Sequence, residues 1–238
     1  FLSQVVPTDI GYLKKLGIVL VNIADLENDV DGYFSYISQW AGNENLKEFA
    51  LLQLELAVEF PNLMEVLRSN STEVMNMLST PMADPSMDVV LSAVNTAAAF
   101  MSGLPDEATL LNFANSAEPM INVLTSTLQQ PELNHEKVKA ALNSFAELTE
   151  AFPRFWKQTL PKLVYVMTSI ANATQFSEEV RNGAVEIIVT LIQRAPGMVK
   201  QEVSSVQEIC KTALNLTYEV DFKDDLEGWN LEETDDVT

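Results

Sequence analysis

The chain has very few of the residues on which most catalytic and metal sites depend. It contains one cysteine, Cys210, and one histidine, His135, among 238 residues. A zinc site needs several such ligands, and a Ser–His or Cys–His pair needs a histidine, so neither can be built without His135. Because His135 lies at an expected helix start, between Asn134 and Glu136, a surface or capping role is favoured. A lone cysteine also excludes an internal disulfide and fits a reducing compartment.

Positive charge is scarce as well. There are 14 Lys and Arg residues against 34 Asp and Glu residues, which gives a net charge of −20 at pH 7. Nucleic-acid backbones and anionic membranes would be repelled, so we expect no direct binding to either, and basic proteins are the natural partners. The longest apolar region, 89–104, is interrupted by polar residues and is too short to span a bilayer. With no glycine-rich phosphate loop, we predict no catalytic residue, no cofactor and no metal, and an enzyme is not expected.

Glycine is also rare, with eight in the chain. Frequent Leu, Ala, Glu and Val favour helices, and no segment shows the alternation of a half-buried strand. The clearest helix lies in 177–196, where Ser177 offers an N-cap oxygen, two glutamates follow it, and Pro196 ends the run. Its apolar residues recur at helical spacing: Val180, Ala184, Ile187, Ile188, Leu191 and Ile192. The predicted fold class is all-α.

The same pattern occurs four times along the chain. Each copy has an alanine, usually three positions after a basic residue, and a proline 11 to 13 positions later. The pairs that begin the copies are Lys47/Ala50, Val90/Ala93, Lys137/Ala140 and Arg181/Ala184, and the prolines are Pro61, Pro105, Pro153 and Pro196. The alanines lie 43, 47 and 44 residues apart. This period, with two helices per unit, predicts an α-solenoid of HEAT repeats built from antiparallel helix pairs, whereas a TPR array would need a period near ~34 residues.

The repeat also predicts the organisation of the chain. Residues 1–218 would form the solenoid, with about five helix pairs of which the first and last are incomplete, and residues 219–238 an acidic loop or tail. Since the pattern is already under way at the first residue, we expect the chain to be part of a longer protein. Pro119 and Pro161 should kink or split their helices, and a bend is expected near Asn70. The expected helices cover 10–24, 30–41, 45–58, 62–78, 85–102, 106–129, 136–151, 154–173, 178–194 and 198–218.

Stacking of the pairs would bury one continuous core between two helical layers. The second helix of each pair carries the alanine and, by analogy with HEAT solenoids, would form the concave layer. Alanine at the crossing point would let neighbouring helices approach closely. We predict that the recurrent Lys or Arg bridges to a carboxylate of the adjacent repeat, which is a structural role.

Residues 219–238 differ in character from the rest. Nine carboxylates stand there against Lys223 alone, which gives −8 of the total charge. Like-charge repulsion favours an extended segment, and a solvated linker is one interpretation. Trp229 would be costly to leave bare in an inert linker, which favours a docking loop. The candidate protein-binding residues are Asp221, Asp224, Asp225, Glu227, Trp229, Glu232, Glu233, Asp235 and Asp236.

Several of these segments together resemble a known family. They are the AFPRFW run at 151–156, the VRNGAVEIIVTL run at 180–191, the APGMV run at 195–199, and the acidic stretch with Trp229 that follows. In these runs the sequence is similar to the importin-β (karyopherin-β) superfamily, most of all to its importin five branch, also called importin subunit beta-3. The resemblance extends over nearly the whole chain, and it is most specific at 187–191.

The resemblance implies a nuclear transport receptor, present here as part of its N-terminal half. Such a receptor binds basic cargo proteins on acidic inner surfaces, Phe-Gly nucleoporins in grooves between outer helices, and Ran-GTP, and it shuttles between cytoplasm and nucleus. The acidic segment would then contact Ran or cargo. The alternative is a HEAT-repeat scaffold of a protein assembly, such as a phosphatase scaffold subunit, which would share the fold and lack Ran binding.

Overall fold

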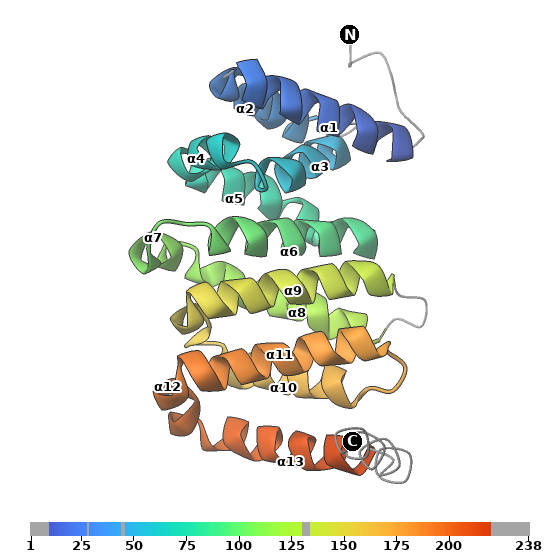
Figure 1. Cartoon of the computed structure of the whole chain (residues 1–238), viewed down its shortest axis with the longest axis vertical. Coiled ribbons are helices and arrows are strands. Elements are labelled where there is room, and N and C mark those ends of the chain that lie inside the picture. The colour runs from blue at the N-terminus through green and yellow to red at the C-terminus, as the bar shows by residue number, and fades with distance from the viewer. Residues whose placement is uncertain (1–9, 28, 44–45, 130–133, 220–238) are drawn as a thin grey trace, which may run out of the picture.

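The chain forms a stack of antiparallel helix pairs, shown in Figure 1 as a computed structural model. The structure describes residues 10–27, 29–43, 46–129 and 134–219. Within these ranges all regular structure is helical, which confirms the all-α solenoid. The second helices α3, α6, α9 and α11 begin 40, 48 and 43 residues apart, a spacing of HEAT type. None of the helices in these ranges is long and apolar enough to cross a membrane.

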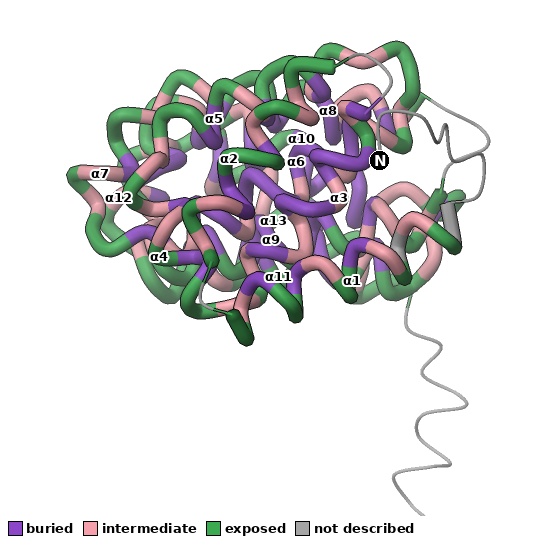
Figure 2. The backbone as a smooth tube through the Cα atoms, turned by 90° about the horizontal axis from the view of Figure 1, so that it is seen from above, coloured by how far each residue is buried: buried purple, intermediate pink, exposed green. Residues whose placement is uncertain are grey.

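The helices form two layers, seen from above in Figure 2. We call them the inner layer and the outer layer. The inner layer holds α1 (Ile10–Glu27), α3 (Lys47–Ala57), α6 (Met87–Ser102), α9 (His135–Ala151) and α11 (Glu178–Arg194), each in contact with the next. The outer layer holds α2 (Val30–Ala41), α4 (Pro61–Ser69), α5 (Ser71–Ser79), η2 (Pro81–Ala83), α7 (Glu107–Leu111), η3 (Ala114–Ser116), α8 (Ala117–Thr127), η4 (Pro153–Trp156), α10 (Leu160–Asn172), α12 (Pro196–Gln201) and α13 (Val203–Glu219).

Prolines set where the outer helices begin and break. Pro61, Pro153 and Pro196 each occupy the first position of an outer element, where the missing N–H costs no helical hydrogen bond. The splits expected at Pro119 and Pro161 are confirmed, because both lie in the first turn of a new helix after a short preceding one. The bend near Asn70 is confirmed as the break between α4 and α5. The start predicted at residue 85 is wrong by two positions, since α6 begins at Met87.

Buried residues lie toward the middle of the molecule (Figure 2), and from Val21 to Val199 they form one hydrophobic cluster. Trp156 is the largest of the fully buried side chains and joins the layers. Its ring lies 5.1 Å from the ring of Phe145 on α9 and 4.7 Å from that of Phe155. Its indole N–H donates to the hydroxyl oxygen of Thr149, 2.9 Å away. The core therefore ties each outer element to the inner helix beside it.

One of the four predicted crossing alanines is wrong by a single residue. Ala50, Ala93 and Ala184 are buried as expected, but Ala140 is exposed and its neighbour Ala141 is fully buried. Consecutive helical residues point about 100° apart, so an error of one position exchanges a core-facing side chain for a surface-facing one. The end of the predicted stripe on α11 is wrong in the same way, since Ile192 is 40% exposed.

The predicted bridges between repeats are confirmed. Lys47 pairs with Asp84 at 3.2 Å, and Lys137 pairs with Asp88 of the preceding repeat at 3.8 Å. Arg181 pairs with Glu219 at the end of α13 and donates to the Ala171 carbonyl oxygen at 2.7 Å. Further junctions are joined by Lys162–Glu118, Arg154–Glu107 and Arg194–Glu150. Many of the few cations of this chain are therefore engaged at the joints between repeats.

Candidate functional site: a groove on the inner layer

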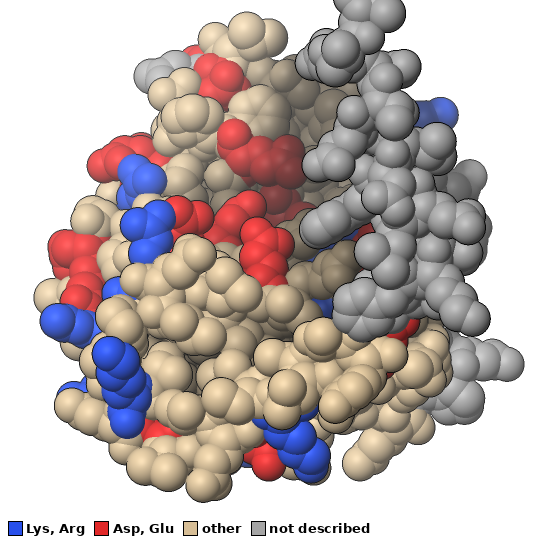
Figure 3. All heavy atoms as spheres, turned by 60° about the horizontal axis from the view of Figure 1, so that its bottom comes forward, with Lys and Arg blue, Asp and Glu red and all other residues tan. Residues whose placement is uncertain are grey.

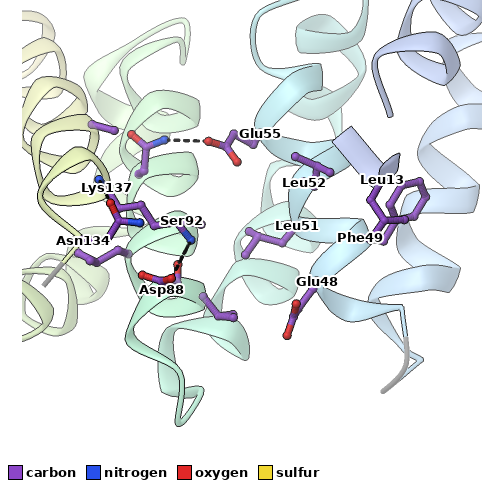
Figure 4. Close-up of a pocket in the computed structure, with 14 residues that line it drawn as sticks. Leu13, Glu48, Phe49, Leu51, Leu52, Glu55, Asp88, Ser92, Asn134 and Lys137 are labelled. Carbon is purple, nitrogen blue, oxygen red and sulfur yellow. Dashed lines mark hydrogen bonds and ion pairs between the residues drawn. The ribbon is translucent and has the colours of Figure 1, made fainter. Parts of the chain in front are cut away.

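The inner layer carries a groove made of two adjoining hollows that cross α3, α6 and α9 (Figures 3 and 4). The first hollow, of about 380 Å³, has Glu48, Asp88 and Lys137 on its lining beside the apolar Leu13 and Leu52. The second hollow, of about 650 Å³, is lined by more polar residues, among them Glu59, Asn143, Glu147, Arg68 and Ala99. Figure 3 shows acidic side chains gathered in a hollow of the molecular surface. The hollows lie on the layer that was predicted to be concave.

Helical spacing brings these side chains to one face. On α3, Glu48 and Glu55 are seven residues apart and Glu59, just beyond the helix, follows four later, which places them along one side at about two and three turns. On α6, Asp88 and Asn95 have the same spacing of seven. The exposed Ala140 lines both hollows, so the residue displaced from the core belongs to the groove.

A hydrogen-bonded row crosses the groove where the two hollows meet. The amide nitrogen of Asn95 donates to Glu55 at 3.4 Å, which is the dashed line at Glu55 in Figure 4. The hydroxyl of Ser144 on α9 donates to the amide oxygen of Asn95 at 2.7 Å. Glu55 and Asn95 each line both hollows. We call this row the Glu55–Asn95–Ser144 bridge.

Negative charge in the groove exceeds positive charge. Two cations lie in it, and both are engaged: Lys137 with Asp88, and Arg68 with Glu65 at 3.2 Å and with the Gly103 carbonyl oxygen at 2.7 Å. Three carboxylates of the lining have no ion-pair partner within the described ranges, namely Glu48, Glu59 and Glu147. The groove is therefore suited to cations that come from another molecule.

A smaller pocket of about 240 Å³ lies on the outer layer between α7–α8 and η4–α10. Phe155 is buried in it and Leu111 is half exposed beside it. Arg154 and Lys157 stand on its rim against one carboxylate, Glu107, at 3.9 Å from Arg154. The same side of the molecule shows a fixed negative charge at Asp106, whose pKa is held below its usual range by hydrogen bonds from Thr109 at the start of α7.

The residues predicted to bind protein from sequence cannot be compared with this groove. Asp221, Asp224, Asp225, Glu227, Trp229, Glu232, Glu233, Asp235 and Asp236 all lie outside the described residues. The sequence interpretation concentrated on that dense acidic run and missed the groove carboxylates, which are spread over three helices. The signal that could have found them is the recurrence of polar residues seven positions apart on successive second helices.

His135 and Cys210, the single histidine and cysteine of the sequence, have surroundings that suggest no catalytic or metal-binding role. His135 is half-buried at the start of α9, with its ring 5.9 Å from that of Phe176, and Asn134 supplies the helix cap. The Ser177 hydroxyl, by contrast, makes no capping hydrogen bond, so that prediction is wrong. Cys210 is exposed. In the part of the chain that the structure describes, no three His, Cys, Asp or Glu side chains are grouped as metal ligands.

Comparison with known proteins places the chain in a family. A family model described as IPO5-like, TPR repeats matches residues 31–166, and one described as importin repeat matches residues 173–238. A comparison with curated proteins found no match. Two solved structures resemble the chain: Kap121p bound to Ste12p, with 16% identity and a TM-score of 0.61 over 97% of this chain, and Kap121p bound to Pho4p, with 15% identity and a TM-score of 0.62 over 98%. At this identity they show the fold, and the chain spans 26% of each of them. The chain belongs to the IPO5-like importins of the importin-β superfamily.

Proposed function

We propose that the chain is part of a nuclear transport receptor, and that its inner groove holds a basic segment of a cargo protein. The observation that carries this proposal is the presence of three carboxylates without ion-pair partners in a groove whose own cations are engaged. Membership of the importin family supports it. The related fold of Kap121p, solved with Ste12p and with Pho4p, supports the binding of other proteins by such a solenoid.

The groove offers both parts of what a lysine or arginine side chain needs. Carboxylates attract the charged head, and the apolar residues of the first hollow, Leu13 and Leu52, can pack against the aliphatic stem. Charge complementarity of this kind governs the rate and selectivity of association more than its ultimate strength. Binding should therefore weaken as salt is raised.

The remaining partners belong to the same proposal. Ran-GTP would bind the receptor, with the nine residues of the acidic segment beyond residue 219 as a loop that contacts Ran or cargo. Phe-Gly nucleoporins would bind the outer layer, where the buried ring of Phe155 and the half-exposed Leu111 offer an apolar surface for a phenylalanine side chain. The protein would act by binding, without catalysis, and shuttle between cytoplasm and nucleus.

Fluorescence anisotropy with a labelled lysine- and arginine-containing peptide tests the groove. The triple variant Glu48→Gln, Glu59→Gln, Glu147→Gln should bind about tenfold or more weakly at ~150 mM salt, since each lost charge faces the ligand directly. A matched control neutralises three carboxylates of the outer side that make no ion pair within the described residues, Asp31→Asn, Glu202→Gln and Glu208→Gln. Equal losses in both variants would show a response to net charge alone and would contradict the groove as the site.

Binding to Ran loaded with GTP or with GDP tests the receptor itself. A preference for the GTP form, reduced by removal of residues 220–238, is expected. Failure to bind either form, together with failure to bind a Phe-Gly peptide, would favour the HEAT-repeat scaffold instead.

A further inference from the structure

The Glu55–Asn95–Ser144 bridge divides the inner groove, and we infer that the two hollows are separate cation subsites that select two basic side chains held apart in one extended segment. This inference rests on the proposed function, since it concerns how the same groove selects its ligand. A single continuous trough would favour any dense basic run. A divided groove favours a segment whose two basic residues are held a fixed distance apart.

The first subsite suits one cation on a long aliphatic stem. Three carboxylates line it: Asp88 faces Lys137 at 3.8 Å and Glu55 accepts from Asn95, which leaves Glu48 without an ion-pair partner. Leu13, Leu52 and Val89 supply apolar wall on both sides of it. Figure 4 shows Glu48 and Asp88 on neighbouring helices, with Leu51 and Leu52 farther along the helix that carries Glu48.

The second subsite has two unpaired carboxylates that come from opposite sides. Glu59 follows α3 and Glu147 lies on α9, while α6 between them presents the small side chain of Ala99. Arg68 is also on the lining, but its guanidinium is held by Glu65 and by a backbone carbonyl oxygen. Two carboxylates across an open space can each accept hydrogen bonds from a different N–H edge of one planar guanidinium, which suits arginine better than lysine. This subsite should therefore prefer arginine.

The bridge is a built feature of the fold. Ser144 is 8% exposed, and its hydroxyl is fixed by the 2.7 Å hydrogen bond to Asn95. Both ends of the Asn95 amide are engaged, the nitrogen by Glu55 and the oxygen by Ser144. A bound segment must pass over this row, and its basic side chains must reach down on either side of it.

Helix geometry sets the spacing. Glu48 and Glu59 are eleven residues apart on α3 and its end. At about 1.5 Å per helical residue this separates the two subsites by roughly 16 Å. An extended peptide advances about 3.3 Å per residue and its side chains alternate between two faces, so the two basic residues should lie about four or about six positions apart.

The test uses the whole chain and peptides of equal length and charge, each with one lysine and one arginine in a neutral polar background. Peptides with the two residues about four or about six positions apart, made in both orders, are compared with a peptide in which they are adjacent. We expect the better spaced peptide to bind about tenfold more tightly than the adjacent one, because the adjacent pair can fill one subsite only. Equal affinities for spaced and adjacent peptides, with binding retained, would overturn the divided groove and leave the proposed function in place.

Two variants locate the effect. Asn95→Ala with Ser144→Ala removes the bridge and should bring the adjacent and spaced peptides to within about twofold of each other. Glu59→Gln with Glu147→Gln should reduce the spaced peptide to the affinity of a peptide with a single cation. Persistence of the spacing preference without the bridge would contradict its role as the divider. Absence of binding by every cationic peptide to the folded unmodified chain would overturn the proposed function together with this inference.

Discussion

The inner groove and the outer pocket lie on opposite layers of one solenoid and have opposite electrostatic character. In the groove, the cations Lys137 and Arg68 are engaged by their own neighbours, and carboxylates are left without partners. In the outer pocket two cations, Arg154 and Lys157, stand against a single carboxylate. The large negative charge of the chain is therefore not a uniform property of its surface. Within the described residues, carboxylates without ion-pair partners line the groove on the second helices.

The difference follows from how the repeat uses its residues. Basic residues recur at repeat junctions because an ion pair there joins two units that cannot fold alone. Acidic residues are in excess, so those not needed at a junction remain free to face the groove. Uncoupling the two layers, or changing the charge of one of them, tests this difference.

The largest loss of stability is expected from a substitution where the core joins the two layers. Trp156→Ala removes a fully buried indole that packs on Phe145 of the inner layer and Phe155 of the outer pocket. The free energy of unfolding should fall by about 3–5 kcal/mol, measured by guanidinium denaturation followed by circular dichroism. Trp40→Ala, at a half-buried site, is the matched control. A loss at Trp156 no greater than at Trp40 would show that the layers are not joined there.

A smaller effect is expected where α2 and α3 meet. The Tyr33 hydroxyl donates to Gln53 at 2.6 Å, both residues are buried, and the Gln53 amide nitrogen has no hydrogen-bond partner in the described structure. Tyr33→Phe should cost about 1–2 kcal/mol, because it leaves the Gln53 oxygen unsatisfied as well. Adding Gln53→Leu should recover most of that loss, since it removes both unsatisfied groups. Urea unfolding of the single and double variants measures the free energy of unfolding of each. A double variant that loses the sum of the two single losses would contradict this coupling.

Burial of Tyr33 also predicts how the stability of the chain depends on pH. Burial raises the pKa of Tyr33 far above its usual value near 10. A phenol with a raised folded-state pKa contributes stability that is complete below the unfolded pKa and is lost as the pH rises above it. The stability of the unmodified chain should therefore decline above about pH 10, and Tyr33→Phe should decline less. Parallel losses in the two chains would assign the decline to other groups.

Much of this architecture could be predicted from sequence because it depends on residues that act locally. Prolines define helix starts through a missing N–H, and the basic residues at junctions find carboxylates of the neighbouring repeat. The shift from Ala140 to Ala141 was missed because the copies were aligned on the spacing from a basic residue to an alanine. The apolar stripe of α9 itself, Val138, Ala141, Leu142 and Phe145, places Ala141 in the core. That one-residue phase also decides which side chains face the groove.

The groove could not be predicted from any one segment of the sequence. Its carboxylates come from α3, α6 and α9, and each is an ordinary exposed acidic residue in its own segment. Only the side-by-side contact of these helices gathers them, and the hydrogen bonds of Asn95 to Glu55 and Ser144 join residues 40 and 49 positions apart in sequence. Residues 220–238, where the acidic run is continuous, gave the stronger sequence signal, and their role stays a prediction.

The smallest effect is expected from substitutions at the outer pocket. Arg154→Ala and Lys157→Ala change exposed side chains, of which Arg154 is 74% exposed and only loosely paired. Exposed ion pairs of this kind contribute little, so the free energy of unfolding should change by less than about 0.5 kcal/mol. Affinity of the inner groove for a basic peptide should stay within about twofold, because the two sites lie on different layers and salt screens the intervening field. A tenfold change in that affinity would mean that the layers share one electrostatic surface, and the division of the molecule into an anionic inner face and a cationic outer pocket would then be wrong.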